Sequence, residues 1–127
     1  DNKFVAGFIG SPAMNCMEGR VRDGAIEVPS LARPVPVAAD FAPEDSEVTV
    51  GLRPEHLTLD SSGETHTVDL TEALGGVSYA YLTSRTGERM IVEERGDVRS
   101  REGDTVGIGF DDDRVYLFDR KSEARLR

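Results

Sequence analysis

The sequence has a single cysteine, Cys16, and no long apolar run among its 127 residues. One cysteine excludes a disulfide within the chain and suits a reducing compartment. No stretch approaches the roughly 18 consecutive apolar residues that a membrane-spanning helix needs. We therefore expect a cytoplasmic protein that does not insert into a membrane by itself.

Basic residues are also scarce. The chain has 15 lysines and arginines against 24 aspartates and glutamates, which gives a formal net charge of −9. Such a charge repels a phosphate backbone unless the basic side chains gather on one face. The arginines that would have to gather are spread along the chain, at Arg20, Arg22, Arg33, Arg95, Arg99 and Arg101. We expect no nucleic-acid partner.

Motifs for catalysis are missing as well. The sequence contains no G-x-x-x-x-G-K-[ST] loop, which nucleotide hydrolases use to cradle phosphates. Gly75 and Gly76 predict a sharp bend between strands. Ser78 stands in an approximate G-x-S-x-G pattern, but its neighbours alternate like a strand, whereas a nucleophile elbow needs a strand-turn-helix. We expect no catalytic residue and no enzyme activity in this chain.

Metal ligands are not indicated either. His56 and His66 are ten residues apart and fit no zinc-ligand spacing, so each is predicted to be a surface or partly buried polar residue. The acidic run at 111–113 lacks the spacing of a calcium loop and predicts a solvated turn. No metal or cofactor is expected in this chain.

The sequence does contain segments in which apolar residues recur at every second position, a pattern typical of strands with one buried face. The alternating residues are Val48, Val50 and Leu52; Val68 and Leu70; Val77, Tyr79 and Tyr81; Val106, Ile108 and Phe110; and Val115 and Leu117. Turn residues separate these segments about every ten residues, as in small barrels and sandwiches. Tyr79 and Tyr81 are expected to share one face and to pack in the core. The pattern predicts an all-β fold.

Two segments depart from this alternation. Four prolines punctuate residues 28–47, which predicts loops and short edge strands. The last residues, 119–127, carry little apolar surface and are expected to fray.

The first residues predict a short helix. Phe4 and Phe8 are four residues apart, and Val5 and Ile9 repeat this spacing before Gly10 and Pro12 end the pattern. The chain begins at Asp1, without an initiator methionine or a signal-peptide pattern, so we expect a piece of a longer protein.

Four stretches give the sequence a family resemblance: FVAGFIGSPAMN, VGLRPEHL, LTEALGGVSYAYL and VGIGFDDDRVYLFD. In this order and spacing they resemble the C-terminal regulatory part of the ATPase subunits of maltose-type carbohydrate ABC importers. The resemblance implies an OB-like barrel, or paired barrels, of the transport-associated (TOBE) type. It implies that residues 1–12 join an absent nucleotide-binding domain and that residues 13–127 form the regulatory domain.

The resemblance also implies a function without catalysis. Such a domain holds two ATPase subunits together as a homodimer, contacts the membrane subunits only indirectly, and offers a surface to regulators in some members. ATP and Mg²⁺ would bind to the missing upstream domain, and the assembly would lie at the inner face of the cell membrane. The alternative is a free-standing OB-like barrel that binds a small ligand such as an oxyanion or a sugar.

Two sets of residues are expected to make these contacts. By resemblance, Phe4, Val5, Phe8 and Ile9 dock on the ATPase domain or on the end of the barrel. The paired face is predicted at Arg53, Glu55, His56, Phe118 and Asp119, with a tight turn after Arg53 and with Phe118 exposed outside the main core. The alternative for Arg53 is a lock with a carboxylate inside the domain.

Overall fold

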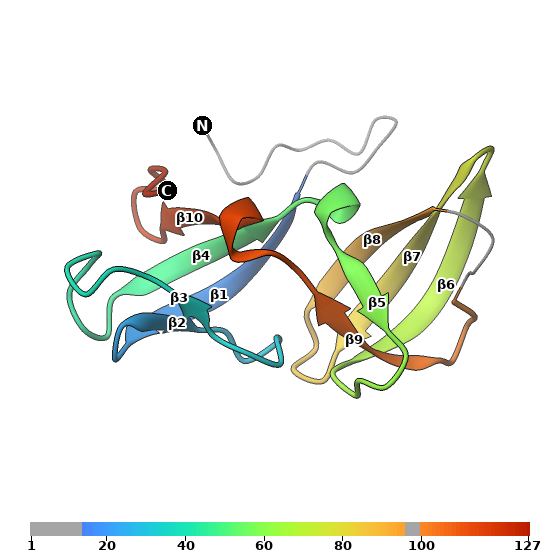
Figure 1. The fold of residues 1–127 in the computed structure, drawn as a ribbon, viewed down its shortest axis with the longest axis horizontal. Coiled ribbons are helices and arrows are strands. Elements are labelled where there is room, and N and C mark those ends of the chain that lie inside the picture. Colours follow the sequence, from blue (N-terminus) through green and yellow to red (C-terminus); the bar gives the residue numbers. More distant parts are fainter. Residues whose placement is uncertain (1–13, 96–99) are drawn as a thin grey trace.

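The computed structural model describes residues 14–95 and 100–127, and these fold into ten strands and two short 3₁₀ helices (Figure 1). The expected N-terminal helix, with Phe4, Val5, Phe8 and Ile9, lies outside the described residues. None of the described helices is long and apolar enough to cross a membrane. The predicted all-β class is confirmed.

The strands form two five-stranded sheets that lie side by side (Figure 1). The first sheet has the order β10-β4-β1-β2-β3, with antiparallel neighbours. Its strands are β1 (Asn15–Arg22), β2 (Ala25–Glu27), β3 (Val35–Pro36), β4 (Glu47–Leu52) and β10 (Tyr116–Asp119).

The second sheet has the order β5-β9-β6-β7-β8 and is also antiparallel. Its strands are β5 (Thr58–Asp60), β6 (His66–Leu74), β7 (Val77–Ser84), β8 (Arg89–Arg95) and β9 (Thr105–Gly109). The end strands β5 and β8 contact each other, so the sheet curls toward a closed barrel. The two 3₁₀ helices, η1 (Pro54–His56) and η2 (Asp112–Arg114), lie on the segments that pass between the sheets.

The tight turns follow from residues that accept positive φ. Asp23 and Gly24 have φ of 51° and 78° in the two-residue turn between β1 and β2, as a type I′ hairpin requires. Gly75 has φ of 71° in the two-residue turn between β6 and β7, which confirms the predicted bend. The proline-rich middle contains only β3, of two residues, as expected.

One apolar cluster runs through both sheets. It includes Val50 and Leu52 from the first sheet, Leu82 and Val92 from the second, and Leu117 from β10, all of them at most 1% exposed. Since a single core joins the sheets, the described chain is one folded unit.

Asn15 connects the sheets through polar contacts. Its side-chain oxygen accepts the Ile91 N–H at 2.7 Å, and its side-chain nitrogen donates to the Ile91 carbonyl at 2.8 Å and to the Leu52 carbonyl at 3.1 Å. The side-chain amide thus satisfies both backbone groups on the outer edge of β8, as a neighbouring strand would. Asn15 is 7% exposed, so it fastens the start of the first sheet to the edge of the second from a buried position.

Two core predictions from alternation are wrong. Leu70 is 46% exposed because a register shift between Val68 and Leu70 turns the rest of β6 over. Tyr79 and Tyr81 do share a face, and Tyr79 is buried as predicted, at 6% exposed. Tyr81 is only half-buried, because the main apolar cluster is lined by the opposite face of β7, at Ala80 and Leu82. The burial of Ser78 follows from its place on that inner face.

Two polar predictions also need correction. His66 was predicted to be a surface or partly buried residue, but it is only 2% exposed. It lies at the start of β6, which pairs with β9 on one side and β7 on the other. The tail does not fray in this structure: Phe118 forms a β-bridge with Arg125, and the Leu126 N–H donates to the Leu117 carbonyl at 2.6 Å. The run at 111–113 is exposed and leads into η2, which confirms the solvated turn.

Candidate interaction surface

The segment after β4 makes the tight turn that the sequence predicts. Arg53 is extended, with φ −77° and ψ 141°, and Pro54 then begins η1 with the φ that its ring imposes. The His56 N–H donates to the Arg53 carbonyl at 3.0 Å and closes the turn. Pro54 is buried, whereas Glu55 points outward and His56 is half-buried. The turn therefore presents Arg53, Glu55 and His56 at one end of the first sheet.

Arg53 meets a tyrosine, not the carboxylate of the alternative interpretation. Its Nε donates to the Tyr116 hydroxyl at 3.4 Å, and its guanidinium carbon lies 5.2 Å from the centre of the Tyr116 ring. In the described part of the chain Arg53 forms no salt bridge within 4.0 Å. The internal Arg–carboxylate lock is therefore not formed.

His56 is joined to Arg114 at the end of η2. Arg114 Nη1 lies 2.8 Å from His56 Nε2. Because a guanidinium can only donate, Nε2 is the acceptor and the neutral ring carries its proton on Nδ1. That Nδ1 atom is buried without a partner among the described residues. The contact holds Arg114 next to the η1 turn.

A third arginine completes the group that we name the Tyr116 cluster: Arg53, His56, Arg114, Tyr116 and Arg125. The guanidinium carbon of Arg125 lies 4.7 Å from the centre of the Tyr116 ring. The hydrogen bond from Arg53 lowers the pKa of Tyr116 below its usual value, and the charges of Arg53, Arg125 and Arg114 add to this effect. Two arginines thus lie against one aromatic side chain, and the charge of a third acts on it, in an otherwise acidic protein.

Phe118 and Asp119, like Glu55, do not join this cluster. Phe118 is on the same face of β10 as Tyr116 but is 4% exposed, so it is not the exposed aromatic that was predicted. It lies beside Gly51 of the neighbouring strand and outside the main apolar cluster. Asp119 accepts bonds from the Ser122 N–H and hydroxyl, both at 2.8 Å, and these lower the pKa of its carboxyl. Both residues serve the folding of this chain, and their part in an interface stays a prediction.

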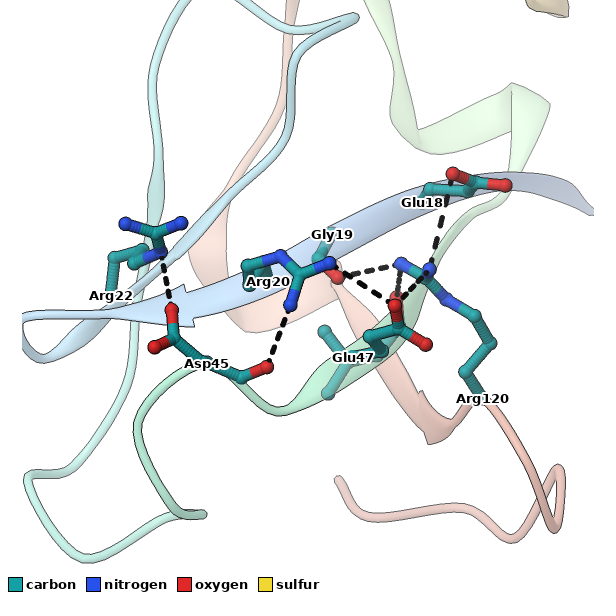
Figure 2. Close-up of polar contacts among 8 residues, drawn as sticks. Glu18, Gly19, Arg20, Arg22, Asp45, Glu47 and Arg120 are labelled. Atoms are coloured by element: carbon teal, nitrogen blue, oxygen red, sulfur yellow. Dashed lines mark hydrogen bonds and ion pairs between the residues drawn. The ribbon is translucent and has the colours of Figure 1, made fainter.

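A second group of arginines, at the far end of β1 and β4, is matched by carboxylates (Figure 2). Arg120 donates to the backbone carbonyls of Gly19 and Val48 at 2.7 and 3.1 Å, and it lies 3.6 Å from the Glu47 carboxylate. Arg20 pairs with the same carboxylate at 3.1 Å. This group ties the chain after β10 to the first sheet.

The remaining members of that group are paired in the same way. Arg22 lies 2.9 Å from Asp45, and Arg120 also approaches Glu18 at 3.9 Å (Figure 2). Every arginine here therefore faces at least one carboxylate, unlike the arginines of the Tyr116 cluster.

An apolar groove lies on the outer face of the second sheet. It has a volume of about 1170 Å³ and is lined mainly by β1, β6, β7 and β8. Leu70 and Leu74 are 46% and 49% exposed at its rim, on the β6–β7 hairpin, which projects from the rest of the sheet (Figure 1). Tyr79 and Tyr81 also line the groove. The hydroxyl of Tyr81 donates to Glu72 at 3.0 Å. Exposed leucines beside aromatic rings are typical of protein contact surfaces.

Sequence reasoning missed Tyr116, Arg114 and Arg125 of the Tyr116 cluster and the groove beside Leu70. A partial signal existed for the cluster, because arginines stand on both sides of the last strand. No sequence signal marked the register shift that exposes Leu70. Among residues 14–95 and 100–127 no group of histidine, cysteine, aspartate or glutamate could hold a metal ion.

Two sequence families match the chain. The family described as the MalK OB fold domain matches residues 10–57, and the family described as the TOBE domain matches residues 50–118. The first match covers most of the first sheet, and the second covers all of the second sheet together with β10. The two matches divide the chain much as the two sheets do.

Similar curated proteins are ATP-binding proteins of importers. The lactose transport ATP-binding protein LacK of Rhizobium radiobacter is 40% identical over 100% of this chain and 38% of its own length. The sn-glycerol-3-phosphate import ATP-binding protein UgpC of Cereibacter sphaeroides is 35% identical over 97% of this chain and 35% of its own. The oligosaccharides import ATP-binding protein MsmX of Bacillus subtilis is 31% identical over 100% of this chain and 38% of its own length. The chain thus spans a little over a third of the length of these relatives.

Proposed function

The chain belongs to the TOBE domain family, and on this premise we propose that it is the regulatory domain of the ATP-binding subunit of a carbohydrate ABC importer. One observation carries the proposal: proteins named as ATP-binding subunits of sugar and oligosaccharide importers match nearly the whole chain, yet the chain spans only about a third of each. The remaining length in those relatives leaves room for a separate ATPase domain. The subunit would lie on the cytoplasmic side of the membrane and meet the membrane subunits through that domain.

The domain itself is not catalytic in this proposal. Its sequence has no phosphate-binding loop, and its described residues contain no group that could hold Mg²⁺. The residues present therefore do not fit an ATP site, and ATP and Mg²⁺ would bind to the rest of the subunit. Phe4, Val5, Phe8 and Ile9 are proposed to dock on the ATPase domain.

The domain would act by pairing with a second copy of itself. A two-fold pair brings the same patch of each copy together, and the groove beside the β6–β7 hairpin offers exposed leucines for such a contact. Pairing through this domain would keep two ATPase domains close while they open and close. Arg53, Glu55 and His56 remain predicted contributors at the η1 turn.

The test uses the full ATP-binding subunit without nucleotide, when the ATPase domains do not hold each other. We expect a dimer in sedimentation velocity and a monomer after removal of residues 14–127. Leu70→Glu together with Leu74→Glu should weaken the dimer at least tenfold, because each charge would be buried in the contact. Leu126→Glu is the matched control, since Leu126 is similarly exposed, at 44%, but lies on the tail. A truncated subunit that stays dimeric would refute the pairing role.

A further inference from the structure

The arginines of the Tyr116 cluster have unused hydrogen-bonding capacity. A guanidinium has five N–H donors, so Arg53, Arg114 and Arg125 together have about fifteen. Three of these make hydrogen bonds within the described residues: one each to Tyr116, to His56 and, from Arg125, to the Arg127 carbonyl. None of the three arginines forms a salt bridge there within 4.0 Å. Among the described residues, most of this charge therefore has no protein partner.

The positions of the guanidinium groups bring them close to one another. Arg53 and Arg125 both lie against the Tyr116 ring, at 5.2 and 4.7 Å from its centre, so their charges are within about 10 Å of each other. Arg114 is near enough to contribute to the lowered pKa of Tyr116. Like charges at such separations repel, and an anion bound beside them relieves the repulsion.

The carboxylates around the cluster do not neutralise it. Asp112 and Asp113 line a hollow of about 320 Å³ together with Tyr116 and Arg125. Asp112 is already engaged by Arg33 at 2.7 Å, outside the cluster. Asp113 has no salt bridge within the described residues, and it weakens but does not cancel the charge of three arginines.

From this unmatched charge we propose that the Tyr116 cluster binds a phosphate dianion, either free or carried by a phosphorylated molecule. Arginine recognises phosphate through paired N–H donors and keeps its charge up to high pH. Arg114 and Arg125 are exposed, so we expect weak binding, with a dissociation constant on the order of 1 mM. The site does not include the groove beside Leu70, although Arg53 and His56 are also predicted pairing contacts, so its test follows phosphate binding and not the oligomeric state.

Tyr116 provides the readout. The chain has three tyrosines, and the pKa of Tyr116 is lowered whereas burial raises the pKa of Tyr79 and of Tyr81. Tyr116 therefore ionises first in a titration of the 295 nm absorbance. A bound dianion disfavours the tyrosinate form and raises the pKa of Tyr116 back toward 10.

The experiment adds inorganic phosphate at constant ionic strength, with sodium chloride as the balancing salt. We expect a saturable rise of roughly half a unit in the pKa of Tyr116. Arg125→Gln should abolish the saturable response, and Asp113→Asn should lower the half-saturating phosphate concentration about threefold by removing a repulsive charge. Arg22→Gln, an exposed arginine that is paired with Asp45, is the matched control and should respond like the wild type.

Further arms identify the source of the phosphate and the outcomes that would overturn the proposal. Phosphoserine is compared with inorganic phosphate, and the lower half-saturating concentration shows whether a phosphate monoester or the free ion is preferred. An equal response to chloride, an unchanged response in Arg125→Gln, or a stronger response to citrate than to phosphate overturns the proposal. The citrate result would instead assign the cluster to carboxylates.

Discussion

The contacts of Asn15 predict that one side chain holds the two sheets together. Asn15→Ala removes three hydrogen bonds, to Ile91 N–H, Ile91 carbonyl and Leu52 carbonyl, at 2.7, 2.8 and 3.1 Å. A net contribution of about 1 kcal/mol for each bond gives about 3 kcal/mol. The backbone groups of Ile91 are only partly buried and regain some hydration in the variant, which sets the expected loss at roughly 2–3 kcal/mol.

Urea unfolding followed by far-ultraviolet circular dichroism measures this loss. With a slope of about 1.5 kcal/mol per molar urea, the midpoint should fall by roughly 1.3–2 M. Asn15→Asp should be at least as damaging, because its carboxylate cannot donate and would face two carbonyl oxygens. Ser62→Ala, which removes an exposed hydroxyl bonded to Asp60 at 2.7 Å, is the control and should change stability by less than about 0.5 kcal/mol. If Asn15→Ala were as stable as this control, the connection between the sheets would have to lie in apolar packing alone.

Two further predictions concern His66 of β6 and Gly63 in the loop between β5 and β6. Desolvation, with a smaller effect from the charge of Arg85, lowers the pKa of His66 from 6.5 to about 4. The unfolded chain therefore binds a proton at His66 more tightly than the folded chain does. The contribution of His66 to the free energy of unfolding is complete above pH 6.5 and should fall by about 1–2 kcal/mol toward pH 4, after allowance for solvent screening. His66→Gln should remove this part of the pH dependence in urea titrations. Gly63→Ala should cost about 3 kcal/mol, because a Cβ there would lie 2.4 Å from the Gly107 backbone. Gly76→Ala, with no atom within 4 Å of the added Cβ, should leave the thermal midpoint nearly unchanged.

Most of the fold class could be predicted from local patterns. Alternation indicated strands, and glycine and aspartate marked the turns at Asp23-Gly24 and Gly75-Gly76, because positive φ is a local requirement. The prolines of residues 28–47 limited that region to one strand of two residues, because proline has no N–H to donate to the hydrogen bonds between strands. This reason is equally local. The family motifs, by resemblance, pointed to the TOBE fold.

The face of a strand that enters the core was harder to predict. Alternation places Tyr79 and Tyr81 on one side of β7, but it does not say which side faces the core. The tyrosine side was expected to pack in the core. Tyr79 is indeed buried, but Tyr81 is only half-buried, and the main apolar cluster takes the side of Ala80 and Leu82. The bulge before Leu70 reversed the pattern within one strand, and nothing in the local residues announces it.

For the candidate contact residues, too, local geometry could be predicted from the sequence, whereas long-range partners could not. The turn at Arg53 could be predicted because Pro54 imposes its geometry, but the partner of Arg53 comes from a strand 63 residues later. The predicted exposure of Phe118 was wrong because its burial depends on Gly51 of the adjacent strand, which leaves room for the ring.

The sequence by itself determined the strand-rich class, the positions of the turns, the acidic charge and the absence of a phosphate-binding loop. These depend on single residues or on neighbours along the chain, whose effects are fixed before any long-range contact forms. Only the tertiary structure decided that Asn15 would bridge two sheets, that Leu70 would be exposed, and that three arginines would gather at Tyr116. Each of these depends on strand register and on residues far apart in the chain, which the packing of a shared core brings together.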